Sequence, residues 1–402
     1  MEQAGAEQLI GGQIAVVGAG IGGLTSASLL ARAGHSVTVF ERAPSVAPVG
    51  AGLLLQPAGV RVLDRLGIGD CVRALGAPVD RLFGTSTAGR TVMDLRYADL
   101  SPGLTGIGVH RAMLQAALLE CALAAGTRLV TGSDITRVSL ANDQTRLVGP
   151  EGMRGIGDPF DLVIVADGAR SALREQIGSV RRARRYPWGA LWFVARNPPA
   201  PFVRTLRQVY GGTRTMLGFL PSGRVDAAGE ETVSVFWSIR ERDWREGFDF
   251  DAWQQRVRAL MPEAGPVFDQ VRAESDLIFA PYFDVDARAS APRVALLGDA
   301  AHAMSPQLGQ GANLAMIDAA ELADAIGRAG SLDAALRKSA KRGRARTAYY
   351  QLATRGLTPW FQSDTPVISP AMGFVRDLGM GPACRFPPTR SLMLRTLTGG
   401  GR

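Results

Sequence analysis

Three glycines near the N-terminus, Gly18, Gly20 and Gly23, have the spacing GxGxxG. In this pattern the first glycine permits a tight turn, the second lets the backbone approach a pyrophosphate, and the third lets a helix pack closely on a strand. The phosphates would face the helix N-terminus, where free N–H groups and the helix dipole favour negative charge. The pattern indicates phosphate binding where a strand precedes it and a helix follows it.

The flanking residues predict those elements. Residues 14–17 are a short β-branched apolar run typical of a buried parallel strand. Residues 24–33 are expected to form a helix and residues 36–40 a second strand. Glu41 closes that strand 18 positions after the last motif glycine, where a carboxylate can accept hydrogen bonds from ribose hydroxyls. This context predicts a dinucleotide site and leaves NAD and FAD both open.

Two further motifs also follow apolar strands. Residues 161–165 lead into Asp167 and Gly168, after which Ser171 and Arg174 open a predicted helix. A strand at 293–297 runs into a second pair in the opposite order, Gly-Asp, and a helix is expected at 314–328. The residues before that helix are rich in glycine, so its free N–H groups and positive dipole end are accessible to a flat, negatively charged group.

In order along the chain, these motifs resemble the fingerprints of the class A flavoprotein monooxygenases, the family of para-hydroxybenzoate hydroxylase. The fingerprints are GxGxxG, DGxxSxxR and GDAAHxxxP, and the resemblance covers roughly residues 12–350. It implies bound FAD, NADPH or NADH as a transient electron donor, and O₂. It also implies an α/β fold, in which a Rossmann-like FAD-binding domain of the three-layer ββα, glutathione-reductase type carries an inserted antiparallel-sheet substrate domain and a helical C-terminal tail.

The resemblance assigns residue ranges to these parts. In some family members a tail such as the last fifty residues covers the pocket or forms a dimer. The FAD-binding domain is expected at 1–75, 100–175 and 287–350, the substrate-binding sheet domain at 76–99 and 176–286, and the tail at 351–402.

The resemblance also implies cofactor contacts. Asp299 would hold a ribityl hydroxyl of FAD, and Arg111 would reach its flavin side. Asp167 is attributed a place near both FAD and the nicotinamide donor, and the loop at 49–57 passes beside the isoalloxazine. Ile135 matches a position whose backbone meets the adenine. The expected cofactor residues are Gly18, Gly20, Gly22, Gly23, Glu41, Arg42, Gly52, Leu54, Arg111, Ile135, Asp167, Asp299, Pro306, Gly309, Gly311, Ala312 and Asn313.

The helix start near residue 310 is expected to make the main electrostatic contribution. Ala312 and Asn313 match positions that contact flavin N1 and O2 through the backbone, and Gly309 and Gly311 let the flat ring approach. Such a helix start would stabilise the anion of the reduced ring by up to ~2 kcal/mol. Pro306 is expected to shape the flavin environment.

No catalytic side chain is assigned, because the flavin carries the chemistry. His302 could be read as a base, but in the family this histidine packs behind the Gly-Asp turn, and we favour that role. The sequence contains no nucleophile triad and no Cys/His cluster, so no metal is expected.

Aromatic residues concentrate between 176 and 286, in alternating stretches that predict antiparallel strands. The inner face of such a sheet would bind an aromatic or apolar substrate. Because strand register decides which face points inward, only candidates can be named. The candidates are Gln56, Trp192, Met216, Phe219 and Trp237.

Composition limits the other possibilities. The 402 residues are 46% hydrophobic and 20% charged, which is typical of a folded soluble protein. The net charge of +8 comes from scattered arginines without a groove-reading motif, so no nucleic-acid partner is expected. The uncharged run at 8–31 holds six glycines, which excludes a good spanning helix. Three distant cysteines favour a reducing compartment, and we expect a cytoplasmic monomer or homodimer.

The resemblance therefore predicts a monooxygenase that hydroxylates an aromatic or other electron-rich small molecule through a flavin C4a-hydroperoxide. Two alternatives stay open. One is a flavin-dependent reductase or oxidase on the same scaffold, and the other is a non-catalytic flavin-binding regulatory protein. A flavin-dependent halogenase is excluded, because the chain lacks a WxWxIP motif and has no lysine before Lys338.

Overall fold

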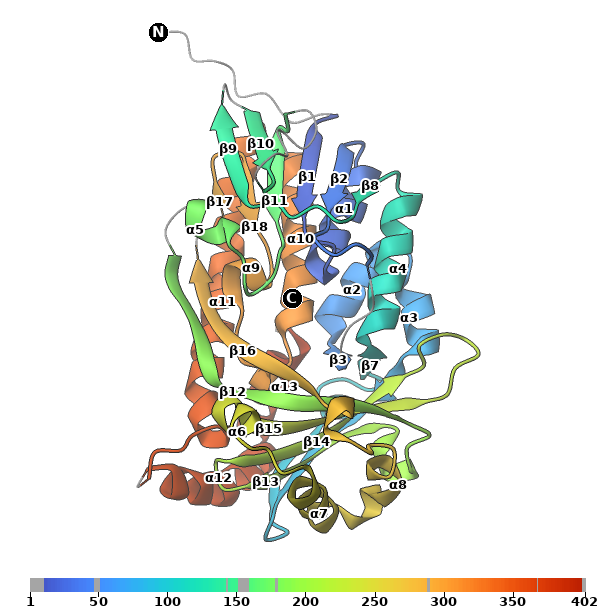
Figure 1. The fold of residues 1–402 in the computed structure, drawn as a ribbon, viewed down its shortest axis with the longest axis vertical. Helices are drawn as coiled ribbons and strands as arrows, with labels where there is room; N and C mark the ends of the chain where they lie inside the picture. The colour runs from blue at the N-terminus through green and yellow to red at the C-terminus, as the bar shows by residue number, and fades with distance from the viewer. Residues whose placement is uncertain are drawn as a thin grey trace.

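The computed structural model describes residues 11–46, 51–141, 144–150, 159–177, 180–287, 290–366 and 368–399. Two large sheets are stacked along the long axis of the molecule, and the last three helices lie on the left, at the lower left and near the middle of the view (Figure 1). No helix in these ranges is long and apolar enough to cross a membrane.

The first sheet has six strands in the order β17-β18-β11-β1-β2-β8. All of its pairings are parallel except β17 with β18. A parallel sheet is normally buried on both faces, and the apolar runs seen in the sequence match this requirement. Its strands are β1 (Gln13–Val17), β2 (Ser36–Phe40), β8 (Arg128–Val130), β11 (Leu162–Val165), β17 (Ser290–Ala291) and β18 (Val294–Leu296).

Alternate residues of β1 enter two different cores, because successive side chains of a strand point to opposite faces. Ile14 and Val16 pack with helices α1 (Ile21–Arg32), α4 (Arg111–Ala124) and α10 (Gly311–Arg328). Ala15 and Val17 pack under the hairpin of β9 (Arg137–Ala141) and β10 (Gln144–Val148). Helices, central sheet and hairpin form three layers, which confirms the expected FAD-binding fold class.

The second sheet has seven strands in the order β16-β12-β15-β14-β13-β5-β6 and is antiparallel except between β13 and β5. One face is covered by α7 (Phe250–Leu260) and α8 (Gly265–Phe268), and the other faces the first domain (Figure 1). Its strands are β5 (Arg81–Ser86), β6 (Thr91–Arg96), β12 (Val180–Arg196), β13 (Thr205–Gly211), β14 (Thr215–Gly223), β15 (Thr232–Arg240) and β16 (Ile278–Ala287).

A small sheet joins the two parts. It contains β3 (Gly52–Leu55), β7 (Gly106–His110) and β4 (Ala77–Val79), in the order β3-β7-β4. Its contact with β14 is so close that a Cβ atom at Gly108 would lie 1.7 Å from the carbonyl oxygen of Pro221. The close approach fixes the position of the second sheet relative to the cofactor domain.

Helix α11 (Leu332–Phe361) runs from the first sheet to the second and continues through residue 350 without a break. The tail boundary expected at 350/351 therefore falls inside one helix. Pro359 lies inside this helix, two residues before its end at Phe361. Helices α12 (Ile368–Arg385) and α13 (Pro387–Thr398) follow, and α12 packs on β6.

The remaining segments are short. The helices are α2 (Pro57–Arg65), α3 (Gly69–Leu75), α5 (Leu173–Ile177), α6 (Glu241–Arg245) and α9 (Asp299–His302), and the 3₁₀ turns are η1 (Tyr97–Asp99), η2 (Ala200–Phe202), η3 (Pro262–Ala264), η4 (Glu274–Asp276) and η5 (Pro306–Leu308).

Candidate flavin site

The glycine motif occupies the turn between β1 and α1, and its glycines differ in role. Gly18 has φ +104°, and a Cβ atom there would lie 2.5 Å from the carbonyl oxygen of Ala166. A Cβ atom at Gly23 would lie 2.0 Å from the carbonyl oxygen of Gly18. At Gly20, by contrast, a Cβ atom would have no neighbour within 4 Å among the described atoms. Two glycines thus serve packing, and the third leaves open space beside the helix N-terminus.

Glu41 is held at the edge of this turn. Its carboxylate accepts hydrogen bonds from the backbone N–H groups of Ala19, at 2.8 Å, and Ala43, at 2.9 Å. Arg42 is exposed next to it, and Ile135 is buried in the core of the hairpin layer. Glu41, Arg42 and Ile135 do not line the cavity described below, and their contact with the adenosine end stays a prediction.

Arg174 ties the Asp-Gly motif to the Gly-Asp motif. Its buried guanidinium donates hydrogen bonds to the carbonyl oxygens of Ala300, at 3.0 Å, and Ala169, at 3.1 Å. The Arg174 backbone N–H donates to Ser171 Oγ at 3.0 Å. The Asp167 Oδ1 atom is buried and has no partner among the described atoms. Burial raises the pKa of Asp167, against hydrogen bonds that lower it.

The start of α10 is open. Its N-cap residue, Gln310, makes no side-chain cap, and the preceding Gly309 is left-handed with φ +60°. A Cβ atom at Gly311 would lie 3.8 Å from Asp299 Oδ1, so this carboxylate stands beside the helix start. The first N–H groups of an α-helix have no partner within the helix. They are therefore available to a ligand here.

Asn313 locks this helix start to strand β3. Its amide nitrogen donates to the carbonyl oxygens of Leu54, at 3.1 Å, and Gly309, at 3.2 Å. Its amide oxygen accepts from the backbone N–H of Gln56 at 2.9 Å. The side chain of Asn313 is thus fully used in positioning, which leaves its backbone N–H for the cofactor contact that the resemblance implies.

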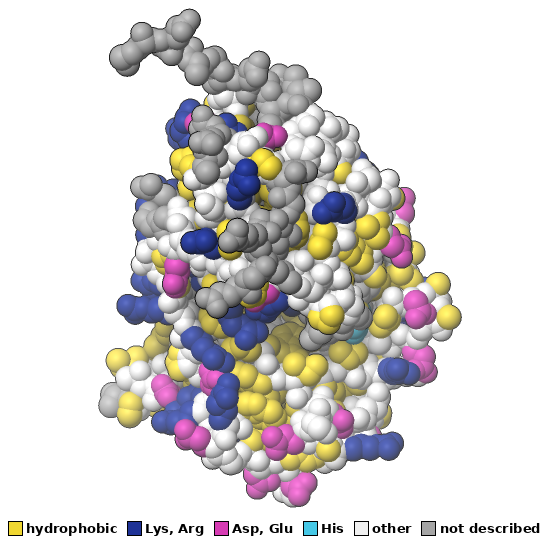
Figure 2. Space-filling view, turned by 45° about the horizontal axis from the view of Figure 1, so that its top comes forward, with side chains coloured by type: hydrophobic (Ala, Val, Ile, Leu, Met, Phe, Trp, Pro, Cys, Tyr) yellow, Lys and Arg dark blue, Asp and Glu magenta, His cyan; other side chains and the backbone are white. Residues whose placement is uncertain are grey.

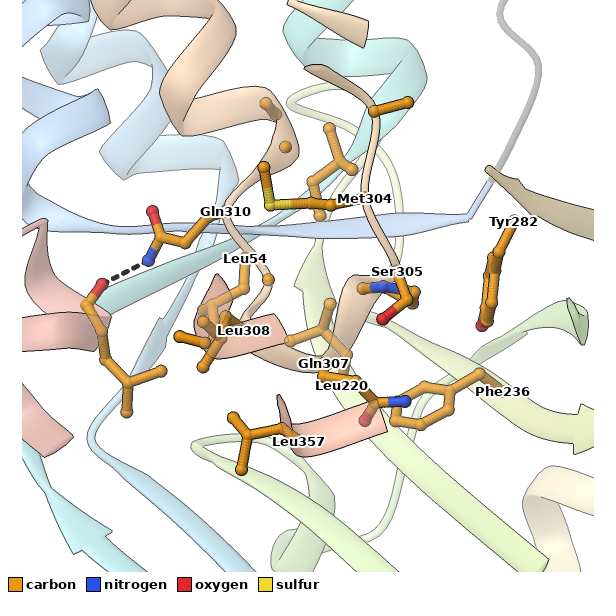
Figure 3. A pocket seen from close by; sticks show the side chains of 18 of the residues that line it. Leu54, Leu220, Phe236, Tyr282, Met304, Ser305, Gln307, Leu308, Gln310 and Leu357 are labelled. Atoms are coloured by element: carbon orange, nitrogen blue, oxygen red, sulfur yellow. Dashed lines mark hydrogen bonds between the residues drawn. The ribbon is translucent and has the colours of Figure 1, made fainter. Parts of the chain in front are cut away.

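A single cavity of about 660 Å³ connects these features (Figure 3). It begins at the glycine turn, passes the start of α10 and reaches the second sheet, where Leu220 and Phe236 lie opposite Leu308 and Leu54. The expected residues that line it are Gly20, Gly22, Gly52, Leu54, Arg111, Asp299, Pro306, Gly309, Gly311, Ala312, Trp192 and Met216. Gly18, Gly23, Glu41, Arg42, Ile135, Asp167 and Asn313 support the site from behind or beyond it. Residues 49 and 50 of the expected flavin loop lie outside the described residues.

Three substrate candidates do not line the cavity, two of them because of strand register and one because it is buried elsewhere. Phe219 and Trp237 point to the other face of the second sheet, where they pack against Phe268 and its neighbours under α7 and α8. Gln56 is fully buried behind β3, where its side-chain oxygen accepts a hydrogen bond from Tyr97. The sequence shows that these strands contain many aromatic residues, but it does not show which face of the sheet each side chain occupies.

The cavity has lining residues that the sequence did not reveal. Phe236 pairs across the strands with Trp192, and the two rings are 5.1 Å apart. The preference for Phe236 over Trp237 could have been found from strand alternation once Trp192 was fixed, because paired residues share a face. The other residues missed include Gln208, Tyr210, Leu220, Tyr282, Met304, Leu357, Met380, Cys384, Met393 and Leu397.

His302 does not line the cavity. It is buried behind the Gly-Asp turn, where its Nε2 atom contacts the carboxylate of Asp318, and Asp318 also accepts from the N–H of Gly298. Arg346 forms ion pairs with Asp318 and Glu321. Burial opposes a charge on His302, but the adjacent carboxylate outweighs it, so the pKa of His302 lies above its ordinary value. The geometry matches the packing role that we favoured.

The described residues fit a flavin dinucleotide. Two uncapped helix N-termini open on one cavity, Gly20 leaves room for a phosphate, and the buried Asp167 Oδ1 lacks a partner. The apolar walls beyond the start of α10 suit a flat ring. No group of His, Cys, Asp and Glu in the described ranges could hold a metal ion. Fold and site together define a Rossmann-type flavoprotein.

Comparison with known proteins agrees with this class. The model of the FAD binding domain family matches residues 12–349. The chain is 34% identical to 3-amino-4-hydroxybenzoate 2-monooxygenase of Streptomyces cremeus, over 87% of each chain. It is 30% identical to 6-hydroxynicotinate 3-monooxygenase of Bordetella bronchiseptica, over 77% of this chain and 81% of that one.

Solved structures show the same fold. A complex of Klebsiella pneumoniae HpxO with FAD and uric acid superposes with a TM-score of 0.78 at 23% identity, over 96% of this chain and 97% of that one. Pseudomonas aeruginosa PqsL, a probable FAD-dependent monooxygenase, gives 0.76 at 25% identity, over 92% and 99%. The chain belongs to the FAD binding domain family of flavin-dependent monooxygenases, and its cofactor is FAD.

Proposed function

We propose that this monooxygenase hydroxylates a small aromatic or heteroaromatic molecule, with NADPH or NADH as electron donor and O₂ as oxidant. One observation carries the proposal: a single cavity joins the phosphate turn, the open start of α10 and the apolar face of the second sheet. A cofactor and a substrate that bind in one cavity can react while both stay bound to the protein. The relatives named above are monooxygenases of hydroxylated ring compounds, which supports the same substrate class.

The bound FAD would accept a hydride and activate oxygen, and the protein supplies binding, orientation and electrostatics. One oxygen atom of O₂ would be inserted into a ring C–H bond. The other would be reduced to water by two electrons from NAD(P)H. The N–H groups of Gly311, Ala312 and Asn313, at the uncapped start of α10, would stabilise negative charge on the ring. Asp299, exposed beside them, is the acceptor available for a ribityl hydroxyl.

The substrate side of the cavity is lined largely by apolar side chains. Met216, Leu220 and Phe236 form an apolar wall from β14 and β15. Tyr282 lies in one apolar cluster with Met216 and Phe236, and burial raises the pKa of its hydroxyl, which therefore stays neutral. A dry cavity limits unproductive loss of activated oxygen to solvent.

We also infer a cytoplasmic monomer or homodimer that needs no nucleic acid. NAD(P)H is a cytoplasmic reductant, and the three cysteines are free thiols. On the face drawn in Figure 2, basic side chains are more numerous on the left, but acidic ones lie between them, which supports a role without a polyanionic partner.

The test incubates the purified, FAD-loaded protein with NADPH or NADH and a panel of phenols, quinolones and other hydroxylated aromatics. We expect at least one compound to accelerate NAD(P)H consumption and to gain the mass of one oxygen atom. Isotopically labelled O₂ should supply that atom. If no compound accelerates consumption while FAD is bound, or if the oxygen comes from water, the proposal is wrong.

A further inference from the structure

The cavity extends beyond the ring site into a region that we call the apolar chamber. It is lined by side chains from the small sheet, the second sheet and the last two helices. Leu54 belongs to the same apolar cluster, so the chamber is continuous with the flavin side. The chamber residues are Leu54, Leu82, Met93, Leu95, Leu206, Leu220, Cys384, Met393 and Leu397.

The chamber contains no charged residue. Among the described residues that line the whole cavity, Arg111 and Asp299 are charged, and both belong to the cofactor side, at the starts of α4 and α9. Burial raises the pKa of the Cys384 thiol, which therefore stays neutral. A carboxylate in this chamber would lose its hydration without gaining an ion pair, so its binding is disfavoured.

The chamber is not simply a closed core. Met93, Leu206 and Met393 are only partly buried although they lie among buried neighbours and line the cavity. The exposed part of these side chains is available for contact with a ligand. Apolar surface that faces a cavity favours an apolar occupant, because its burial removes that surface from water.

Helix α13 forms the end wall of the chamber and is attached to the flavin site. Gln310, the N-cap residue of α10, donates a hydrogen bond to the carbonyl oxygen of Leu397 at 2.6 Å (Figure 3). Tyr350 of α11 donates to the carbonyl oxygen of Thr396 at 2.8 Å. Two neighbouring elements thus attach this wall to the side of the ring site.

From this geometry we propose that the substrate is an aromatic ring that carries an uncharged apolar substituent. The ring lies between the start of α10 and the wall of Met216 and Phe236. The substituent occupies the apolar chamber, and Met393 on α13 limits its length. The proposal rests on the proposed function and adds the substrate class to it.

The experiment measures binding to the FAD-loaded protein, through the change of flavin absorbance, so it does not need turnover. The ligands are 4-alkylphenols from methyl to heptyl and the matched phenols whose chain ends in a carboxylate. We expect affinity to rise about fourfold per methylene until the chamber is full. Each carboxylate should bind at least about tenfold more weakly than its alkyl match.

Variants locate the effect. Met393→Arg should abolish the chain-length dependence and favour the carboxylate series. Met393→Trp should move the optimum to shorter chains, and it serves if the arginine variant fails to fold. Phe374→Arg, on an exposed position of α12 outside the cavity lining, is the matched control and should bind like the unmodified protein.

Affinity that is independent of chain length, equal affinity for the carboxylates, or no binding of any alkylphenol would overturn the proposal. The failure of the proposed function can be distinguished from the failure of the chamber proposal. Chain-length-dependent binding without oxygen insertion into any compound would refute the hydroxylase and keep the chamber. Oxygen insertion into short or carboxylated rings, with no chain-length effect, would refute the chamber alone.

Discussion

At the scale of residues, the site depends on side chains that never touch a substrate. The guanidinium of Arg174 bonds to two carbonyl oxygens in two different motifs, and the amide of Asn313 joins α10 to β3. Leaving a buried polar group without its partner costs roughly 1–3 kcal/mol, so these bonds hold the strand ends in register. Asp299 differs from them, because it is exposed into the cavity and is free for a ligand.

We predict that Asp299→Ala gives colourless protein. Hydrogen bonds to a charged group contribute about 1.5–3 kcal/mol, so FAD affinity should fall by roughly 10- to 150-fold. The measurement is flavin absorbance after gel filtration, together with titration of FAD into the apoprotein. Asp251→Ala, at an exposed position of α7, is the control and should stay yellow. Full occupancy in Asp299→Ala would remove Asp299 from the cofactor site.

At the scale of elements, a buried charge network fixes α9, α10 and α11 to one another. Asp318 of α10 contacts His302 of α9 and Arg346 of α11, and it accepts from the N–H of Gly298. Breaking a buried pair is strongly destabilising, because the remaining charge has no partner. The network therefore positions the Gly-Asp turn and the start of α10 without taking part in the chemistry.

This network predicts a pH dependence of stability. The folded-state pKa of His302 is raised above the ordinary value of 6.5, so its contribution is fully present below about pH 6.5. It is lost as the pH rises through the folded-state pKa. Urea unfolding of the FAD-loaded protein should show the free energy of unfolding falling across this window.

His302→Gln should remove that fall. His35→Gln is the control. Burial lowers the pKa of His35, so its contribution to the free energy of unfolding rises with pH instead of falling. A fall that persists unchanged in His302→Gln would show that another group causes it.

At the scale of the whole molecule, the cavity is made where separate parts of the chain meet. Its walls come from the first sheet, the small sheet, the second sheet and the three C-terminal helices. A ligand in this cavity contacts all of these parts. Because it binds the folded state alone, it stabilises all of them together.

We predict that FAD raises the stability of the whole chain in one transition. At 100 times its Kd, FAD should add about 2.7 kcal/mol to the free energy of unfolding. Riboflavin phosphate, which lacks the adenosine end expected at Glu41, should give a smaller shift at the same concentration. Thermal unfolding at several FAD concentrations measures both. A midpoint that does not move with FAD would contradict the site.

Much of the cofactor side could be predicted from the sequence because its signals are local. The roles of Gly18, Gly20 and Gly23 follow from a tight turn between adjacent elements, and the same holds for the glycines before α10. A resemblance in three ordered motifs then gave the fold class and FAD. These signals depend on residues that are neighbours in the sequence, so they can be read before the tertiary structure is known.

The substrate side was decided by tertiary structure. Trp192 and Met216 face the cavity while Phe219 and Trp237 face away, because a shift of one residue in a strand reverses the face of its side chain. Met393 and Leu54 pack against the same apolar cluster although more than three hundred residues separate them. No local sequence pattern predicts this packing. Sequence therefore determined what the chain binds as cofactor, and only packing between distant elements decided the shape and polarity of the place beside it.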